Sequence, residues 1–366
     1  MADKTIYTAP RIFTGEEWLP DHSIIINNCI IESLLPTVSL PDDAIIKDFS
    51  DGFIAPAFID LQIYGAGEKL LSAYSEADSL KRLVEYCNKG GAAYCLPTVA
   101  TNTKDVFFRS IDAVKDYWNT GGKGILGLHI EGPWINPVKR GAHLESLVHS
   151  PTIDEVKELL DYGRGVIKMI TLAPEVCNQE VIDLICSEKI IIAAGHSNAT
   201  YKEAMESFDN GISTVTHLYN AMSPLQHRSP GLVGATLHND FVTASIIPDG
   251  YHVDYPAISI AKQIMKERLF VITDAVTETP VGPYQHYLAG DKYESGGILS
   301  GSALTMGKAL YNLVNHVNIK LDESLRMCSL YPAKVMGLDH ELGRIRPGYK
   351  ADMVLVNDDL QSVSLL

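Results

Sequence analysis

Residues 127–143 read GLHIEGPWINPVKRGAH, a stretch in which a short apolar strand ends at Glu131 and a Gly-Pro break follows. A carboxylate at the end of a buried strand costs free energy unless a cation or hydrogen-bond donors meet it. Two later strand candidates end at His196 and His217, and another ends at Asp274. One carboxylate, two imidazoles and a nearby free acid suit a divalent metal, so the pattern predicts a metal-dependent hydrolase.

From about residue 54 onward, apolar strand-like runs alternate with amphipathic helical segments. This alternation is typical of a parallel sheet covered by helices. Eight such runs predict a closed (β/α)8 barrel of about 250 residues. The runs lie at residues 53–63, 92–99, 125–130, 166–172, 190–194, 213–216, 241–247 and 269–273. A doubly wound sheet is the alternative, but no G-x-G-x-x-G motif follows a strand here.

The two ends of the chain have a different character from this alternating region. Residues 1–53 contain short β-rich runs and turn signals without a convincing helix. The tail at 339–366 contains one strand candidate, at 351–356. We therefore expect an α/β fold: a TIM barrel at 54–338 with a small β-sandwich domain built from both end segments.

The segment after the eighth strand is rich in Gly, Pro and Tyr, which predicts a long loop at 276–300. Two helices are expected after it, at 304–317 and 322–336.

Composition narrows the classes of function. The formal net charge of -15 argues against non-specific binding to nucleic acid or anionic membranes. No apolar run approaches the roughly 20 residues that a membrane helix needs, and the N-terminal residues lack a secretion-signal pattern. The six cysteines are scattered without a C-x-x-C pair, as in proteins with reduced thiols. These features predict a cytoplasmic protein without nucleic-acid or membrane partners.

Five candidate site residues lie at or just past the ends of proposed strands: Glu131, His196, His217, His252 and Asp274. Barrel enzymes place their chemistry on the loops at these strand ends. Glu131, His196 and His217 suit zinc or another borderline divalent ion, with one position left open for water. Asp274 is the candidate general base, which would take a proton from water and later pass it to a leaving amine. A histidine alone is more often a core or loop residue, so this prediction rests on the group.

Other polar residues near these strand ends have less specific assignments. His129 alternates onto the same side of its strand as the predicted glutamate ligand and is expected to support the site or pack beside it. His143 and His252 flank the site and either donate to a substrate oxygen or have a structural role. Asn220 and neighbouring backbone N–H groups could cradle a phosphate, and Arg228 would supply a cation.

Long stretches of the chain resemble the sugar-phosphate deacetylases of the amidohydrolase superfamily. The stretches are PAFIDLQIYG, GLHIEGPWINPVKRGAH, AGHSNATYKEA, THLYNAMSPLQHRSPGLVGA, PDGYHVDY, VITDA, LSGSALTM and GRIRPGYKADMVLV. The resemblance implies hydrolysis of the acetamide of N-acetylglucosamine 6-phosphate, in amino-sugar catabolism or cell-wall recycling. It also implies one divalent metal ion per subunit, with zinc as the first choice and iron, cobalt or manganese as alternatives.

The resemblance also assigns roles to individual residues. Glu131, His196 and His217 would bind the metal, with Glu131 standing where many relatives use a carbamylated lysine, and Asp274 would be the catalytic acid and base. The substrate contacts would be Ala142, His143, Asn220, Ala221, Arg228, His252, Ile298, Leu299 and Ser300. In the family, the arginine of the Arg-x-Pro-Gly segment reaches the neighbouring subunit's site. A homodimer with Arg228 in that role is therefore expected.

The first strand departs from the family pattern. Many amidohydrolases carry His-x-His at its end, where it holds a second metal, but this chain has Gln62-Ile63-Tyr64. Some relatives have Gln-x-Asn there and use one metal, and Tyr64 differs even from these. Neither Gln62 nor Tyr64 is a good ligand for a transition metal. We therefore expect a single-metal site, with Gln62 hydrogen-bonding near the water.

Two alternative functions follow from the same residues. A cyclic amidase similar to dihydroorotase would need a lysine at the bridging position and usually His-x-His, and this chain has neither. A non-catalytic barrel that binds sugar phosphates would not need the predicted metal ligands or Asp274.

Overall fold

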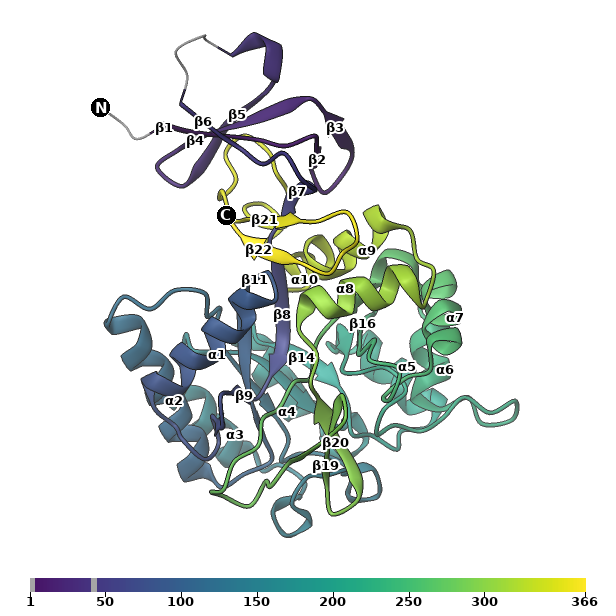
Figure 1. The fold of residues 1–366 in the computed structure, drawn as a ribbon. Helices are drawn as coiled ribbons and strands as arrows, with labels where there is room; N and C mark the ends of the chain where they lie inside the picture. The colour runs from purple at the N-terminus through teal and green to yellow at the C-terminus, as the bar shows by residue number, and fades with distance from the viewer. Residues whose placement is uncertain (1–3, 41–44) are drawn as a thin grey trace. The chain divides into compact units, whose positions relative to one another are not determined.

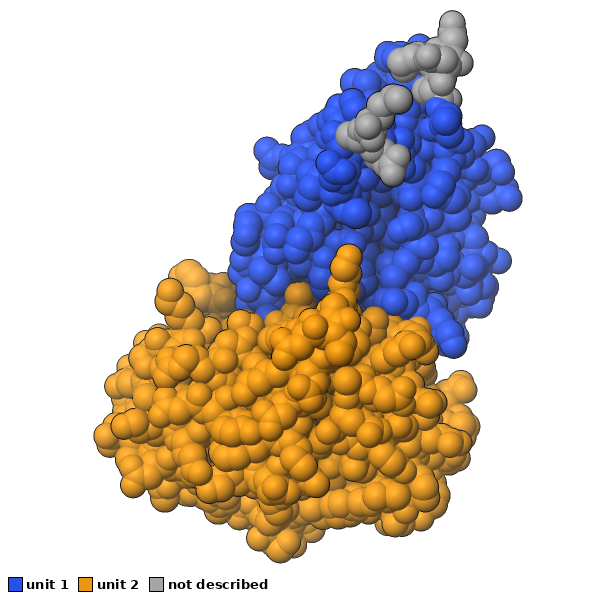
Figure 2. Space-filling view, turned by 90° about the vertical axis from the view of Figure 1, so that its left-hand side faces the viewer, with its two compact units in different colours: residues 1–60, 87–94, 305–366 blue, residues 61–86, 95–304 orange. Residues whose placement is uncertain are grey.

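The structure is a computed structural model that describes residues 4–40 and 45–366. The chain divides into two compact units, which Figure 2 colours separately. Unit 1 contains residues up to 60, 87–94 and 305–366, and unit 2 contains 61–86 and 95–304. The expected domain boundaries at residues 53 and 338 stay a prediction. The first predicted segment also includes residues 1–3 and 41–44, which lie outside the described residues.

The largest sheet has eight strands, in the order β17-β16-β15-β14-β13-β12-β11-β8. They are β8 (Phe58–Ile63), β11 (Ala92–Ala100), β12 (Leu128–Glu131), β13 (Ile167–Leu172), β14 (Ile191–Ala194), β15 (Thr214–Val215), β16 (Thr243–Ile246) and β17 (Leu269–Val271). Neighbours from β11 to β17 pair in parallel. Just past β17, the N–H of Asp274 donates to the carbonyl of Gln62 and the N–H of Tyr64 donates to that of Ala275, both at 2.9 Å. These bonds bring the sheet close to a closed barrel and confirm the predicted architecture.

A helix follows each strand of this sheet along the chain (Figure 1). The helices are α1 (Ala77–Lys89), α2 (Lys104–Asn119), α3 (Ile153–Tyr162), α4 (Gln179–Ser187), α5 (Tyr201–Asp209), α6 (Gly231–His238), α7 (Tyr255–Met265) and α8 (Met306–Asn315). The start of α5 is a capping box, in which Thr200 and Glu203 bond each other's backbone N–H groups. No helix in the described part of the chain is long and apolar enough to cross a membrane.

Two smaller sheets lie in unit 1. One has the order β5-β4-β1-β6 and the other β22-β21-β7-β2-β3. Their strands are β1 (Lys4–Thr8), β2 (Arg11–Phe13), β3 (Trp18–Pro20), β4 (His22–Asn27), β5 (Ile30–Pro36), β6 (Ile46–Asp48), β7 (Phe53–Pro56), β21 (Met353–Val356) and β22 (Val363–Leu365). Residues from both sheets, among them Ile24 and Ile54, share one buried apolar cluster. The C-terminal strand β21 pairs antiparallel with β7, which confirms that both chain ends build the small β domain.

The expected strand at 53–63 is two strands, because β7 pairs with β21 whereas β8 belongs to the barrel sheet. The expected helix at 322–336 is also two elements, α9 (Leu321–Cys328) and α10 (Leu330–Val335). Between them Ser329 has φ -129° and ψ -70°, which is not helical. Pro332 lacks an N–H and could not continue the bonding of a single helix.

The expected loop at 276–300 was also wrong. It contains β18 (Tyr287–Ala289), β19 (Lys292–Ser295) and the start of β20 (Ile298–Ser302), which pair antiparallel. Most residues of β18 and β19 are exposed or half-buried. These strands therefore lack the alternating apolar pattern from which half-buried strands are predicted.

Candidate active site

The predicted site residues converge in unit 2, at the carboxyl ends of the barrel strands. Glu131 is the last residue of β12, while His196, His217 and Asp274 lie two or three residues beyond β14, β15 and β17. All four line one pocket of about 360 Å³. His196, His217 and Asp274 have left-handed backbones, with φ of 48°, 36° and 55°. Such angles are uncommon outside glycine and often occur at functional sites.

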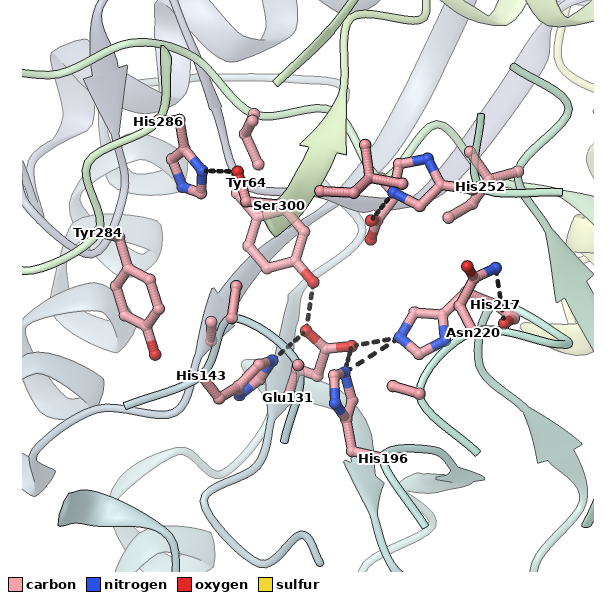
Figure 3. Close-up of a pocket in the computed structure, with 18 of the residues that line it drawn as sticks. Tyr64, Glu131, His143, His196, His217, Asn220, His252, Tyr284, His286 and Ser300 are labelled. Carbon is pink, nitrogen blue, oxygen red and sulfur yellow. Dashed lines mark hydrogen bonds and ion pairs between the residues drawn. The ribbon is translucent and has the colours of Figure 1, made fainter. Parts of the chain in front are cut away.

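Three ligand-type atoms form a small triangle in this pocket (Figure 3). Glu131 Oε1 lies 3.1 Å from His217 Nε2 and 3.3 Å from His196 Nε2, and the two nitrogens are 3.2 Å apart. Ligands at about 2.0–2.1 Å from a tetrahedral zinc are about 3.3–3.4 Å from one another. The three side chains are also buried, with 1–6% of each residue exposed. The spacing therefore fits a small divalent ion.

The hydrogen bond of His196 supports the same conclusion. Its Nδ1 lies 3.0 Å from the carbonyl oxygen of Lys139. A carbonyl can only accept, so Nδ1 carries a proton, and in the tautomer that a metal requires the lone pair of Nε2 is the free one. That lone pair faces the Glu131 carboxylate, which also only accepts. A cation between the two atoms would satisfy both.

The charges around Glu131 favour its anionic form. Burial by itself would raise the pKa of Glu131, but the imidazoles of His196, His143 and His217 outweigh it and hold this pKa well below its usual range. Burial opposes protonation of His217, yet its bond to Glu131 raises the pKa of His217 overall. Among the described residues, no partner bonds the buried Nδ1 of His217.

His143 is a second candidate ligand in the same cluster. Its Nε2 lies 3.3 Å from Glu131 Oε2, and Glu131, His143 and His196 form a group compact enough to hold a metal. We favour His217 over His143 because His196 and His217 approach the same carboxylate oxygen, Oε1. Nδ1 of His143 bonds the hydroxyl of Thr101 at 2.6 Å. Burial and the neighbouring His196 lower the pKa of His143 to about 4, so its ring is neutral at pH 7.

Asp274 lines the same pocket as the three candidate ligands. Nε2 of Gln62 donates to its Oδ1 at 2.8 Å, and Nε2 of His252 lies 3.8 Å from its Oδ2. Burial raises the pKa of Asp274, although the imidazoles of His217 and His252 partly oppose this. A raised pKa makes the carboxylate a stronger base. The nearby His252 is itself held by Asp249, whose Oδ2 accepts from Nδ1 at 2.5 Å.

With this geometry in view, comparison with known proteins places the chain in a family. Residues 53–364 match the model of the Amidohydrolase family, and residues 6–50 match that of the NagA composite domain. The chain belongs to the amidohydrolase family. The resemblance seen in the sequence is therefore confirmed.

Several similar amidohydrolases act on N-acetylhexosamine phosphates. The chain is 32% identical over 363 residues to N-acetylglucosamine-6-phosphate deacetylase of Haemophilus influenzae, over 96% of this chain and 95% of that protein. It is 30% identical to N-acetylgalactosamine-6-phosphate deacetylase of Escherichia coli O157:H7, over 97% and 96%. The crystal structure of N-acetylglucosamine-6-phosphate deacetylase from Pasteurella multocida matches with a TM-score of 0.93 and 32% identity, over 98% and 97% of the two chains.

His129 lies beneath the amidohydrolase site and is completely buried. Its Nε2 is 2.8 Å from the hydroxyl of Thr171, and its Nδ1 is 3.2 Å from the carbonyl of Leu61. Burial lowers the pKa of His129 to about 4. Because both ring nitrogens already have protein partners, His129 has none to offer a metal.

Most of the residues expected to contact substrate line the pocket. They are Ala142, His143, Asn220, Ala221, His252, Leu299 and Ser300. Two others do not line it: Ile298 is 54% exposed, and Arg228 lies in the exposed run 224–229. The structure thus brings the predicted set together in one chain apart from these two residues.

The sequence did not point to three pocket residues of the 276–300 segment, Val276 and the two with polar atoms, Tyr284 and His286. Tyr284 donates to the carbonyl of Thr101 at 2.6 Å, and Nδ1 of His286 lies 2.8 Å from the hydroxyl of Ser300. Burial lowers the pKa of His286 to about 4, which keeps its ring neutral. The available signal was a cluster of aromatic and imidazole side chains in the loop after the last barrel strand, where barrel enzymes carry function.

Proposed function

We propose that this amidohydrolase removes the acetyl group of N-acetylglucosamine 6-phosphate, which gives glucosamine 6-phosphate and acetate in amino-sugar catabolism or cell-wall recycling. The observation that carries the proposal is the buried triangle of Glu131, His196 and His217 beside Asp274 in a pocket of about 360 Å³. A pocket of this size suits a small ligand. The similar deacetylases support the substrate class.

Glu131, His196 and His217 would hold one divalent ion, for which zinc is the first choice and iron, cobalt or manganese are alternatives. When bound, such an ion polarises a carbonyl oxygen and lowers the pKa of a water molecule. Asp274 takes the proton of the attacking water as its oxygen bonds to the acetamide carbon. Asp274 then returns this proton to the amide nitrogen as the C–N bond breaks, so the products are acetate and the amine.

Two neighbours hold Asp274 and the substrate in place for this transfer. Gln62 donates to Oδ1 of Asp274 and so leaves Oδ2 facing His252. Asp249 accepts from Nδ1 of His252 and keeps the other nitrogen of that ring toward the pocket. We assign His252 to a substrate oxygen near the reacting amide.

A substrate panel tests the function. We expect the zinc-loaded protein to release acetate from N-acetylglucosamine 6-phosphate, and kcat/KM to fall roughly 100-fold without the phosphate because its charged hydrogen bonds are lost. A coupled acetate assay would include N-acetylgalactosamine 6-phosphate, unphosphorylated N-acetylglucosamine and dihydroorotate. Ring opening of dihydroorotate alone would support the cyclic amidase, and sugar-phosphate binding without turnover would support the non-catalytic barrel.

We further propose a homodimer in which Arg228 reaches the neighbouring site. Arg228 is exposed on the loop between β15 and α6 and does not line its own pocket. Among the described residues that line the pocket, Lys139 is the one lysine or arginine. A phosphate group there would gain a bidentate cation if a second chain supplied Arg228.

Replacing Arg228 by alanine should raise KM for the phosphorylated substrate roughly 10- to 100-fold, through loss of the charged hydrogen bonds. Steady-state kinetics would measure it, with the exposed Arg109→Ala as the matched control. Co-expression of Arg228→Ala with Asp274→Asn should restore low KM at one site, because the subunit with an intact Asp274 receives Arg228 from its partner. Mixed dimers that keep the high KM would contradict the exchange of Arg228 between subunits.

Location is the remaining prediction. The six cysteines are free thiols in the structure. Unpaired thiols are common in reducing compartments, so we propose the cytoplasm. The negative charge continues to argue against nucleic-acid and anionic-membrane partners.

A further inference from the structure

Two side chains from the end of β8 bind the carboxylates of the site, although neither is a metal ligand. The hydroxyl of Tyr64 hydrogen-bonds Oε2 of Glu131 (Figure 3). Nε2 of Gln62 lies 3.0 Å from Glu131 Oε1, 2.8 Å from Asp274 Oδ1 and 2.8 Å from the Tyr64 hydroxyl. Tyr64 and Gln62 therefore connect the predicted metal ligand to the predicted base.

These contacts give the two oxygens of Glu131 different surroundings. Oε1 faces His196 and His217, whereas Oε2 faces the Tyr64 hydroxyl and Nε2 of His143. A phenol has an ordinary pKa near 10 and is a hydrogen-bond donor at neutral pH. The hydrogen bond from the Tyr64 hydroxyl to Oε2 fixes the orientation of the Glu131 carboxylate, so that Oε1 points toward the two histidines.

The Tyr64 side chain is also held firmly in this position. Its ring packs against a buried cluster of Leu70, Val276 and Tyr284. Its backbone N–H donates to Ala275, and its carbonyl accepts from Leu71 at 3.0 Å. With both the ring and the backbone restrained, the hydroxyl is in place before any ligand binds.

Glu131 and Asp274 are two buried acids close to the same amide group. Adjacent buried carboxylates repel each other unless positive charge or hydrogen-bond donors lie between them. In this chain the NH₂ group of Gln62 reaches both carboxylates. A second cation between the two carboxylates would have to displace this NH₂ group, and an amide nitrogen is not itself a metal ligand.

We propose that Tyr64, together with Gln62, takes the place of a second metal ion. The Tyr64 hydroxyl holds Oε2 of Glu131, so that Oε1 alone is left to bind one metal ion. Tyr64 is a positioning residue in this scheme. The proposal rests on the metal site of the proposed function but not on the identity of the sugar substrate.

Tyr64→Phe tests the hydroxyl alone, because the ring and its packing remain. We expect the zinc dissociation constant, measured by competition with a chromophoric chelator, to rise roughly 10- to 100-fold, as is typical when a partner of a metal ligand is lost. In the cobalt-substituted protein, the freed Oε2 should raise the coordination number and weaken the visible absorption bands. Tyr284→Phe is the matched control, since its hydroxyl bonds the Thr101 carbonyl in the same pocket and its loss should leave zinc affinity unchanged.

The number of bound ions gives an independent test that does not depend on the fold of one variant. Mass spectrometry of the purified wild-type protein should find one tightly bound ion per chain, whereas Gln62→His/Tyr64→His should bind two. Two ions in the wild type, or wild-type zinc affinity and cobalt spectra in Tyr64→Phe, would overturn the proposal. An inactive substrate panel with these metal results intact would reject the deacetylase function and leave the role of Tyr64 standing.

Discussion

Replacing Asp274 by asparagine should lower kcat roughly 10³- to 10⁴-fold while the metal content per chain stays at the wild-type level. Asparagine keeps an oxygen that can accept from Gln62, so the local packing and hydrogen bond are preserved. It cannot take a proton from water at neutral pH, and general acid–base catalysis commonly contributes a factor of this size. Acetate release and elemental analysis on the same preparation would measure the two effects.

The matched control for this substitution is Asp254→Asn. Asp254 is exposed and precedes α7 without a side-chain capping bond, so kcat should not change. A tenfold loss or less in Asp274→Asn would show that another group transfers the proton. Loss of the metal in Asp274→Asn would instead place this carboxylate among the ligands.

Replacing Glu131 by glutamine should remove most of the bound metal and lower kcat/KM roughly 10³-fold. The neutral amide oxygen is a weaker ligand than a carboxylate. If the amide NH₂ took the place of Oε2, it would meet the Tyr64 hydroxyl, which donates there in the wild type. Elemental analysis after gel filtration would measure the metal content. Excess zinc in the assay should restore part of the activity, because His196 and His217 remain.

Two histidine variants decide which imidazole completes the set. His217→Ala should lose the metal, whereas His143→Ala should retain it, because only His217 shares Oε1 of Glu131 with His196.

Glu145→Gln is the matched control for Glu131→Gln, since the exposed side chain of Glu145 pairs only with Arg140 among the residues described. Full metal content in Glu131→Gln would rule out the proposed ligand set.

The sequence could predict that the candidate metal ligands lie close together, because the barrel strands are buried on both faces. All six positions of β8 are buried, for example, and such strands appear in sequence as apolar runs. A polar residue at the end of one of these runs is therefore conspicuous. Since parallel strands bring their carboxyl ends to one edge, Glu131, His196 and His217 could be expected together without knowledge of their distances.

The hairpin of β18 to β20 could not be predicted in the same way. Most of its residues are half-buried or exposed, so burial imposes no alternation of apolar and polar residues on them. His286 reaches Ser300 only because the hairpin folds back on itself, and Tyr284 reaches Thr101 from 183 residues away. Neither contact follows from a residue's position relative to a strand end.

By itself, the order of apolar and polar residues determined the eight βα units, the strand ends that carry Glu131, His196, His217 and Asp274, and the membership of both chain ends in one β domain. Only the tertiary structure decided which oxygen of Glu131 faces the histidines and that Tyr64 holds the other. The physical reason is that buried helices and strands need apolar residues in regular patterns, and these patterns can be read along the sequence. A hydrogen bond such as that of Gln62 with Asp274, 212 residues apart, instead depends on side-chain directions set when the barrel closes.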